Sequence, residues 1–74
     1  MPRFFFDLRQ GDAVIHDEEG EELPDLSAAR CEAGQTALAL GRERITEDNL
    51  VVAVEVRDEK DEKVARAILT LHVE

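Results

Sequence analysis

The stretch that most constrains the fold of this chain is residues 50–57, with the sequence LVVAVEVR. Four of its eight residues are valine, and β-branched side chains favour extended backbone. Val52, Val54 and Val56 alternate with the other residues, so all three lie on one face of a strand. A strand with such a face is stable when that face is covered, so the chain must contain a sheet and an element that packs on it.

Residues 64–73 repeat the alternation. One face carries Ala67, Leu69, Leu71 and Val73, and these alternate with Arg66, Ile68, Thr70 and His72 on the other face. Residues 58–63 (DEKDEK) form a charged turn between the two runs. Two alternating runs joined by a short polar segment predict a β-hairpin.

A second hairpin is predicted at the N-terminus. Residues 3–9 (RFFFDLR) place Phe4, Phe6 and Leu8 on one face. Residues 10–12 contain Gly11 and read as a turn, and residues 13–16 (AVIH) read as a short strand. Residues 17–22 (DEEGEE) predict an acidic loop that does not enter the core.

A helix is predicted over residues 26–40. Its apolar positions recur at helical spacing in one narrow stripe, made of Leu26, Ala29, Ala33, Ala37 and Leu40. Because the stripe is mostly alanine, the helix can lie close to the surface that it covers.

The ends of this helix carry their own signals. Asp25 is the expected N-cap, with Ser27 as the alternative. Gly41 predicts the end of the helix, and Gly34 in its interior predicts a close approach of another element. Residues 46–49 (TEDN) predict a loop.

These elements predict one domain over residues 1–74, of the α+β class and in the order ββαββ. A four-stranded antiparallel sheet would carry the helix on one face. Consecutive strands are expected to pair, while the order of strands between the two hairpins stays open. The residues expected to face the helix are Phe4, Phe6, Leu8, Val52, Val54, Val56, Leu69 and Leu71.

The charge of the chain restricts its partners. Eighteen acidic residues against nine Lys and Arg give a net charge of -9. Such a surface repels nucleic acid and anionic membranes, so a charged partner is expected to be a basic protein. Because the first residues do not resemble an export signal and Cys31 is the single cysteine, we expect a cytoplasmic protein without a membrane helix.

The face of the sheet away from the helix is more apolar than solvation requires. Phe5, Val51, Ala53 and Ile68 are expected there and suggest an interface between two copies of the chain. Cys31 and Leu38, on one flank of the helix, form a second possible interaction surface. The alternative is that these residues are scattered and shielded by arginine side chains.

No catalytic, cofactor-binding or metal-binding residue is predicted. Cys31, His16 and His72 lie in no recognisable motif, and Glu55 is expected to be solvated. The acidic loop at residues 17–22 lacks the ligand spacing of an EF-hand. A chain this short is also expected to have little room for a pocket of several hundred Å³.

Several segments together resemble a known family. They are MPRFFF at residues 1–6, Gly11-Asp12, DEEGEELPD at residues 17–25 and AARCEA at residues 28–33. The pattern is similar to a small, uncharacterised bacterial family of domains of unknown function, the family 6894 type. Its members tend to have an Asp-Gly turn in the second hairpin, which this chain lacks. The resemblance implies a cytoplasmic stand-alone domain, with no activity, cofactor or site residue to transfer.

Three functions follow as hypotheses. The first is a non-enzymatic protein-interaction module that forms a homodimer. The second is an acidic adaptor or inhibitor that binds a basic protein. The third is a small metal-binding protein or enzyme.

Overall fold

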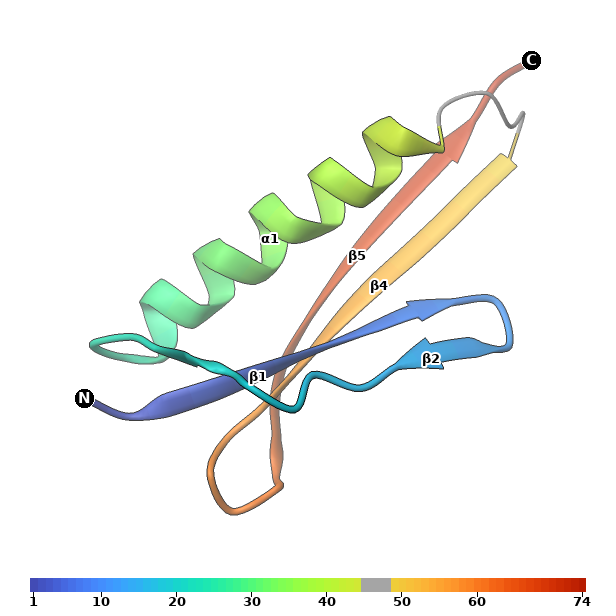
Figure 1. Ribbon diagram of the computed structural model, residues 1–74. Helices are drawn as coiled ribbons and strands as arrows, with labels where there is room; N and C mark the ends of the chain where they lie inside the picture. The colour runs from blue at the N-terminus through green and yellow to red at the C-terminus, as the bar shows by residue number, and fades with distance from the viewer. Residues whose placement is uncertain (45–48) are drawn as a thin grey trace.

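The central element is the valine-rich strand β4 (Asn49–Arg57) of the computed structural model, which describes residues 1–44 and 49–74. On one side β4 pairs antiparallel with β1 (Arg3–Gln10), and on the other with β5 (Lys63–His72). β2 (Ala13–Ile15) continues the sheet beyond β1, so the order is β2-β1-β4-β5 (Figure 1). Both predicted hairpins are confirmed, and the contact between them is made by β1 and β4.

A further short strand lies inside the acidic loop, where a loop alone was expected. β3 (Glu21–Glu22) pairs with Arg3 and Phe4 at the start of β1. The Arg3 guanidinium donates to the Glu22 carboxylate at 2.9 Å and to the Glu19 carbonyl oxygen at 2.9 Å. These charge-assisted bonds hold two acidic residues against the sheet edge.

Helix α1 (Leu26–Glu43) packs on β4 and β5, on one face of the sheet (Figure 1). The Asp25 carboxylate accepts a hydrogen bond from the Ala28 amide at 2.9 Å, which confirms Asp25 as the N-cap. The N-cap side chain thus satisfies one of the free amides of the first turn.

The predicted end of the helix at Gly41 was wrong. Helix α1 continues to Glu43, and Gly41 is buried inside it. A Cβ atom at Gly41 would overlap the side chain of Leu69, so glycine serves close packing there. The close approach predicted at Gly34 was also wrong within this chain, because a Cβ atom there would meet nothing within 4 Å.

The core lies between α1 and the sheet. Val52, Val54 and Val56 are fully buried, and the helix presents Ala29, Ala33 and Ala37 to the sheet. Small helix residues let the backbones approach, which confirms the predicted α+β packing. Leu26 is 40 % exposed because it is the first residue of α1, so the stripe begins at Ala29 instead.

Of the loop predicted at residues 46–49, Asn49 alone is described, and it begins β4; the rest lies outside the described residues. Across residues 1–44 and 49–74, we find no helix with the length and apolar character needed to span a bilayer.

Candidate functional site

Two carboxylates are buried on the face of the sheet opposite α1. Asp7 and Glu55 are register partners in β1 and β4, and they are 3 % and 7 % exposed. The prediction that Glu55 is solvated was wrong, because β4 is a central strand and long cations lie around it. Its oxygens are 3.4–4.0 Å from nitrogens of Arg9, Lys63 and Arg66.

Asp7 is held by a separate set of donors. The Arg57 guanidinium donates two hydrogen bonds to it at 2.6 and 3.1 Å, and the Asp17 amide donates one at 3.0 Å. A ring nitrogen of His16 lies 3.2 Å away. Burial alone would raise the pKa of Asp7, but these bonds outweigh it and hold the pKa below its ordinary value. The same partnership raises the pKa of Arg57.

At the outer edge of β1, the Asp17 carboxylate takes the place of a carbonyl group of a neighbouring strand. Its carboxylate accepts from the amide of Phe6 at 3.0 Å and from the amides of Glu19 and Gly20 at 3.1 Å. Burial would raise the pKa of Asp17, but these three amides lower it below its ordinary value. With β2 on one side of Asp17 and β3 on the other, the outer edge of β1 is covered along its length.

The charged side chains on this face of the sheet are paired with other groups of the same chain. The lowered pKa of Asp7 is unlike the raised pKa of a catalytic acid, and the Glu55 carboxylate is paired with the Arg9 guanidinium at 3.4 Å. His16 contacts Asp7, and His72 contacts Asn49 and Glu74. In the described part of the chain, no three His, Cys, Asp or Glu side chains gather as a group that could hold a metal ion. Sequence reasoning missed the Asp7 cluster because it needs the pairing of β1 with β4.

In contrast to β1, strand β5 lies at an open edge. Among the described residues it pairs with β4 alone. The main-chain groups of successive strand residues point to opposite sides. Because the Phe6 amide points outward to Asp17, the main chain of the next residue, Asp7, points to β4 and its partner Glu55.

The same alternation continues across the sheet to the open edge. Val54, next to Glu55, directs its main chain toward β5, where its partner is Ala67. The residues on either side of Ala67 therefore point their N–H and C=O groups away from the sheet. In the middle of β5, the residues whose main chain faces the open edge are Arg66, Ile68 and Thr70.

The predicted surface residues do not form one patch. Val51 and Ile68 are 60 % and 57 % exposed on the face away from α1. Phe5 lies under the Arg57 guanidinium, 5.1 Å from ring centroid to Cζ. Ala53 is buried, because it lies in β4 between Arg9 and Ile68 of the neighbouring strands. Ala53 is therefore not exposed on this face, whereas Phe5 is half-buried and covered on one side by Arg57.

The predicted flank of α1 lies beside β5. Cys31 and Leu38 are exposed, and with Gly34 they line a groove of about 420 Å³ whose opposite wall includes Ala67 and Ile68. A second hollow of about 250 Å³ adjoins it, since Leu38 and Leu69 line both. The structure thus brings Cys31, Leu38 and Ile68 together at the open edge.

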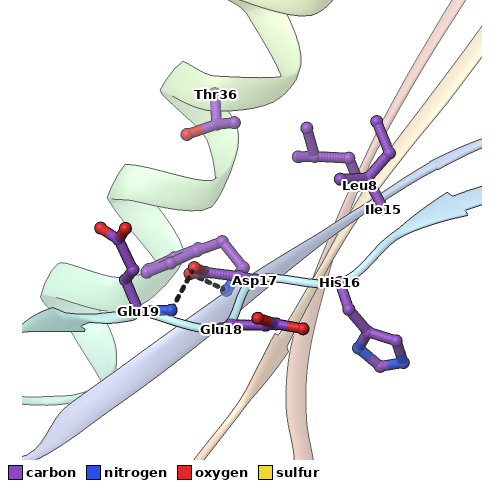
Figure 2. Close-up of a pocket in the computed structure, with 8 residues that line it drawn as sticks. Leu8, Ile15, His16, Asp17, Glu18, Glu19 and Thr36 are labelled. Carbon is purple, nitrogen blue, oxygen red and sulfur yellow. Dashed lines mark hydrogen bonds between the residues drawn. The ribbon is translucent and has the colours of Figure 1, made fainter.

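Another groove, of about 490 Å³, lies on the other side of α1 (Figure 2). Phe6, Leu8 and Ile15 supply its apolar lining, Thr36 faces them from α1, and Glu18 and Glu19 belong to its rim. The chain was expected to have little room for a pocket of several hundred Å³, and this groove is of that size. The β1–β2 hairpin projects beyond the helix, so the hollow is an open groove between them (Figure 1).

Comparison with known proteins gives a family and no function. No curated protein and no solved structure matches this sequence. The family model described as "Domain of unknown function (DUF6894)" matches residues 3–70, which include β1 to β4, α1 and β5 as far as Thr70. The chain therefore belongs to the DUF6894 family of domains of unknown function.

Proposed function

We propose that this domain is a non-enzymatic protein-interaction module that self-associates through the open edge of β5. The single observation that carries the proposal is the row of main-chain groups at Arg66, Ile68 and Thr70, which pair with no strand within residues 1–44 and 49–74. An uncovered edge strand is a template for another strand, and proteins usually protect such edges. The bacterial and cytoplasmic setting expected from the sequence is part of the same proposal.

The contrast between the two edges supports this function. At the β1 edge, the Asp17 carboxylate and two short strands occupy the main-chain groups. At the β5 edge, residues 65–71 (ARAILTL) include one charged residue, Arg66, and no proline. β5 is the longest strand of the sheet. It therefore carries few of the charged residues and prolines that usually protect an edge strand from pairing with another strand.

We expect the protein to be a dimer across micromolar concentrations, with twice the chain mass of 8.3 kDa. Ile68→Lys should give a monomer, because a lysine on an exposed edge strand disfavours pairing with another strand. Ile15→Lys is the matched control, since Ile15 is 61 % exposed and lies on the far hairpin. Light scattering and sedimentation measure the mass. A wild-type monomer, or an Ile15→Lys variant that dissociates equally, contradicts the proposal.

A second candidate function is an acidic adaptor that binds a basic protein segment. It is favoured by the groove between α1 and the β1–β2 hairpin, whose lining includes three acidic residues and no Lys or Arg. The Asp17 carboxylate accepts hydrogen bonds from backbone amides. The Glu18 and Glu19 carboxylates have no hydrogen bond or ion pair in the described structure. A segment with an apolar side chain between lysines fits this chemistry.

A synthetic peptide in which leucines alternate with lysines tests the second function by fluorescence anisotropy. We expect binding that weakens with salt and falls about tenfold in Glu19→Lys. Glu62→Lys makes the same charge change in the distant β4–β5 turn and should have little effect. Equal losses in both variants would indicate unspecific attraction and exclude a site in the groove.

A further inference from the structure

We infer that the flank of α1 formed by Cys31, Gly34 and Leu38 is the second half of the self-association surface and packs against the same flank of a second copy. This inference rests on the proposed pairing of β5 edges and adds a helix–helix contact to it. The three residues line the groove whose other wall is the edge strand β5.

The spacing of the sheet brings the two helices together. Helix α1 lies over β4 and β5, and neighbouring strands are about 4.8 Å apart. If β5 pairs with β5 of a second copy, the two helices lie on the same face of one continuous sheet. Their axes are then roughly 10 Å apart, which is the separation of packed helices.

The register is set by charge and by the direction of the edge groups. Symmetric antiparallel pairing must place one β5 residue opposite itself. Centring on Arg66 would oppose two cations, which is unfavourable. Centring on Ile68 instead opposes two side chains that are 57 % exposed, and it sets Arg66 against Thr70 of the second copy. Both residues at this centre direct their main chains to the edge, so they exchange hydrogen bonds.

The helix flank fits this centre. Gly34 and Leu38 line the groove beside Ile68, so they lie near the two-fold axis. The two helices run antiparallel across the axis, which sets Leu38 of one copy near Gly34 of the other. Leu38 is 57 % exposed, and the space where a Gly34 Cβ would lie is empty. A large side chain then fills a hollow that the single chain leaves open.

Gly34→Leu tests this contact, because it has opposite effects on folding and on association. The single chain has space at Gly34, and leucine favours helix more than glycine, so the unfolding temperature of the monomer should not fall. The new side chain should block the second helix and raise the dimer dissociation constant about tenfold or more. Sedimentation equilibrium measures the constant, and thermal unfolding is followed in the Ile68→Lys background, where we expect monomers.

Ala39→Leu is the control for Gly34→Leu, since Ala39 is an exposed α1 residue outside the groove. It should leave the dissociation constant unchanged. Cys31 gives an independent readout, because it is the single thiol of the chain. In this register the two Cys31 residues lie ten positions, or about 15 Å, apart along the helix axes. A bismaleimide with a long flexible spacer should join two wild-type chains and fail to join Ile68→Lys chains.

The outcomes separate this inference from the proposed function. A Gly34→Leu dimer as tight as wild type, with Ile68→Lys monomeric, overturns the helix contact and leaves the edge pairing intact. Dimers in both variants overturn the edge pairing itself. Cross-linking of Cys31 that persists in Ile68→Lys also contradicts the shared interface.

Discussion

Replacing Asp7 by asparagine is expected to lower the free energy of unfolding by about 3 kcal/mol, because removing one partner of a buried ion pair leaves the other uncompensated. Asp7 is 3 % exposed and accepts two hydrogen bonds from Arg57. Asparagine keeps the shape but removes the charge. In a domain of this size the melting temperature should fall by about 12–24 °C.

The pH dependence of stability gives a second reading of the same site. Asp7 and Asp17 both have pKa values below their ordinary 3.8 in the folded protein. A carboxylate with a lowered pKa stabilises the fold above its unfolded-state pKa, and that stabilisation is lost as the pH falls through the folded-state pKa. We therefore expect stability to be level above about pH 5 and to decline below about pH 4.

Urea unfolding at a series of pH values checks both expectations. Asp7→Asn should show a shallower decline in acid than wild type, because one of the two lowered groups is gone. Asp12→Asn makes the same chemical change at an exposed turn residue and should behave as wild type. If Asp12→Asn and Asp7→Asn lose equal stability, the ion pair does not hold this face of the sheet.

Replacing Ala33 by leucine is expected to destabilise the protein by about 1–3 kcal/mol through overpacking. Ala33 is 1 % exposed, in the buried cluster that contains Val54 and Val56. The added carbon atoms have no space between α1 and the sheet, so the helix must shift outward. That shift would also expose the valines that the alanines now cover.

The effect of Ala33→Leu is measured by chemical denaturation at one protein concentration. Ala39→Leu is the matched control, because it makes the same substitution at an exposed position of α1. The two substitutions have nearly the same helix propensity, so a difference between them reports packing alone. Equal stability of the two variants would mean that α1 does not lie on the sheet through its alanines.

Asp7→Asn and Ala33→Leu also distinguish folding from association. Asp7 and Ala33 lie away from the groove beside β5, so their loss should weaken folding without selectively weakening the dimer. Ile68→Lys and Gly34→Leu are expected to weaken the dimer without weakening the folding of the single chain. This separation makes a loss of association distinguishable from a loss of structure.

Local patterns determined the helix, its Asp25 cap and the two hairpins, because each depends on residues close in the chain. The valines at 52, 54 and 56 can bury one face together in a strand, and alanines four residues apart share one side of a helix. The family resemblance drew on the same local segments, chiefly residues 1–33, and the family model confirms it.

Other features depend on which strands lie side by side, and only the tertiary structure shows this. The order of β1 beside β4 buries Glu55, joins Asp7 to Arg57 and leaves β5 as the open edge. Gly41 reads as a helix end in the sequence, yet contact with Leu69 makes it a packing residue. Alternation fixes which face a side chain takes, but it does not say which strand lies alongside, because strand order depends on contacts between residues distant in the chain.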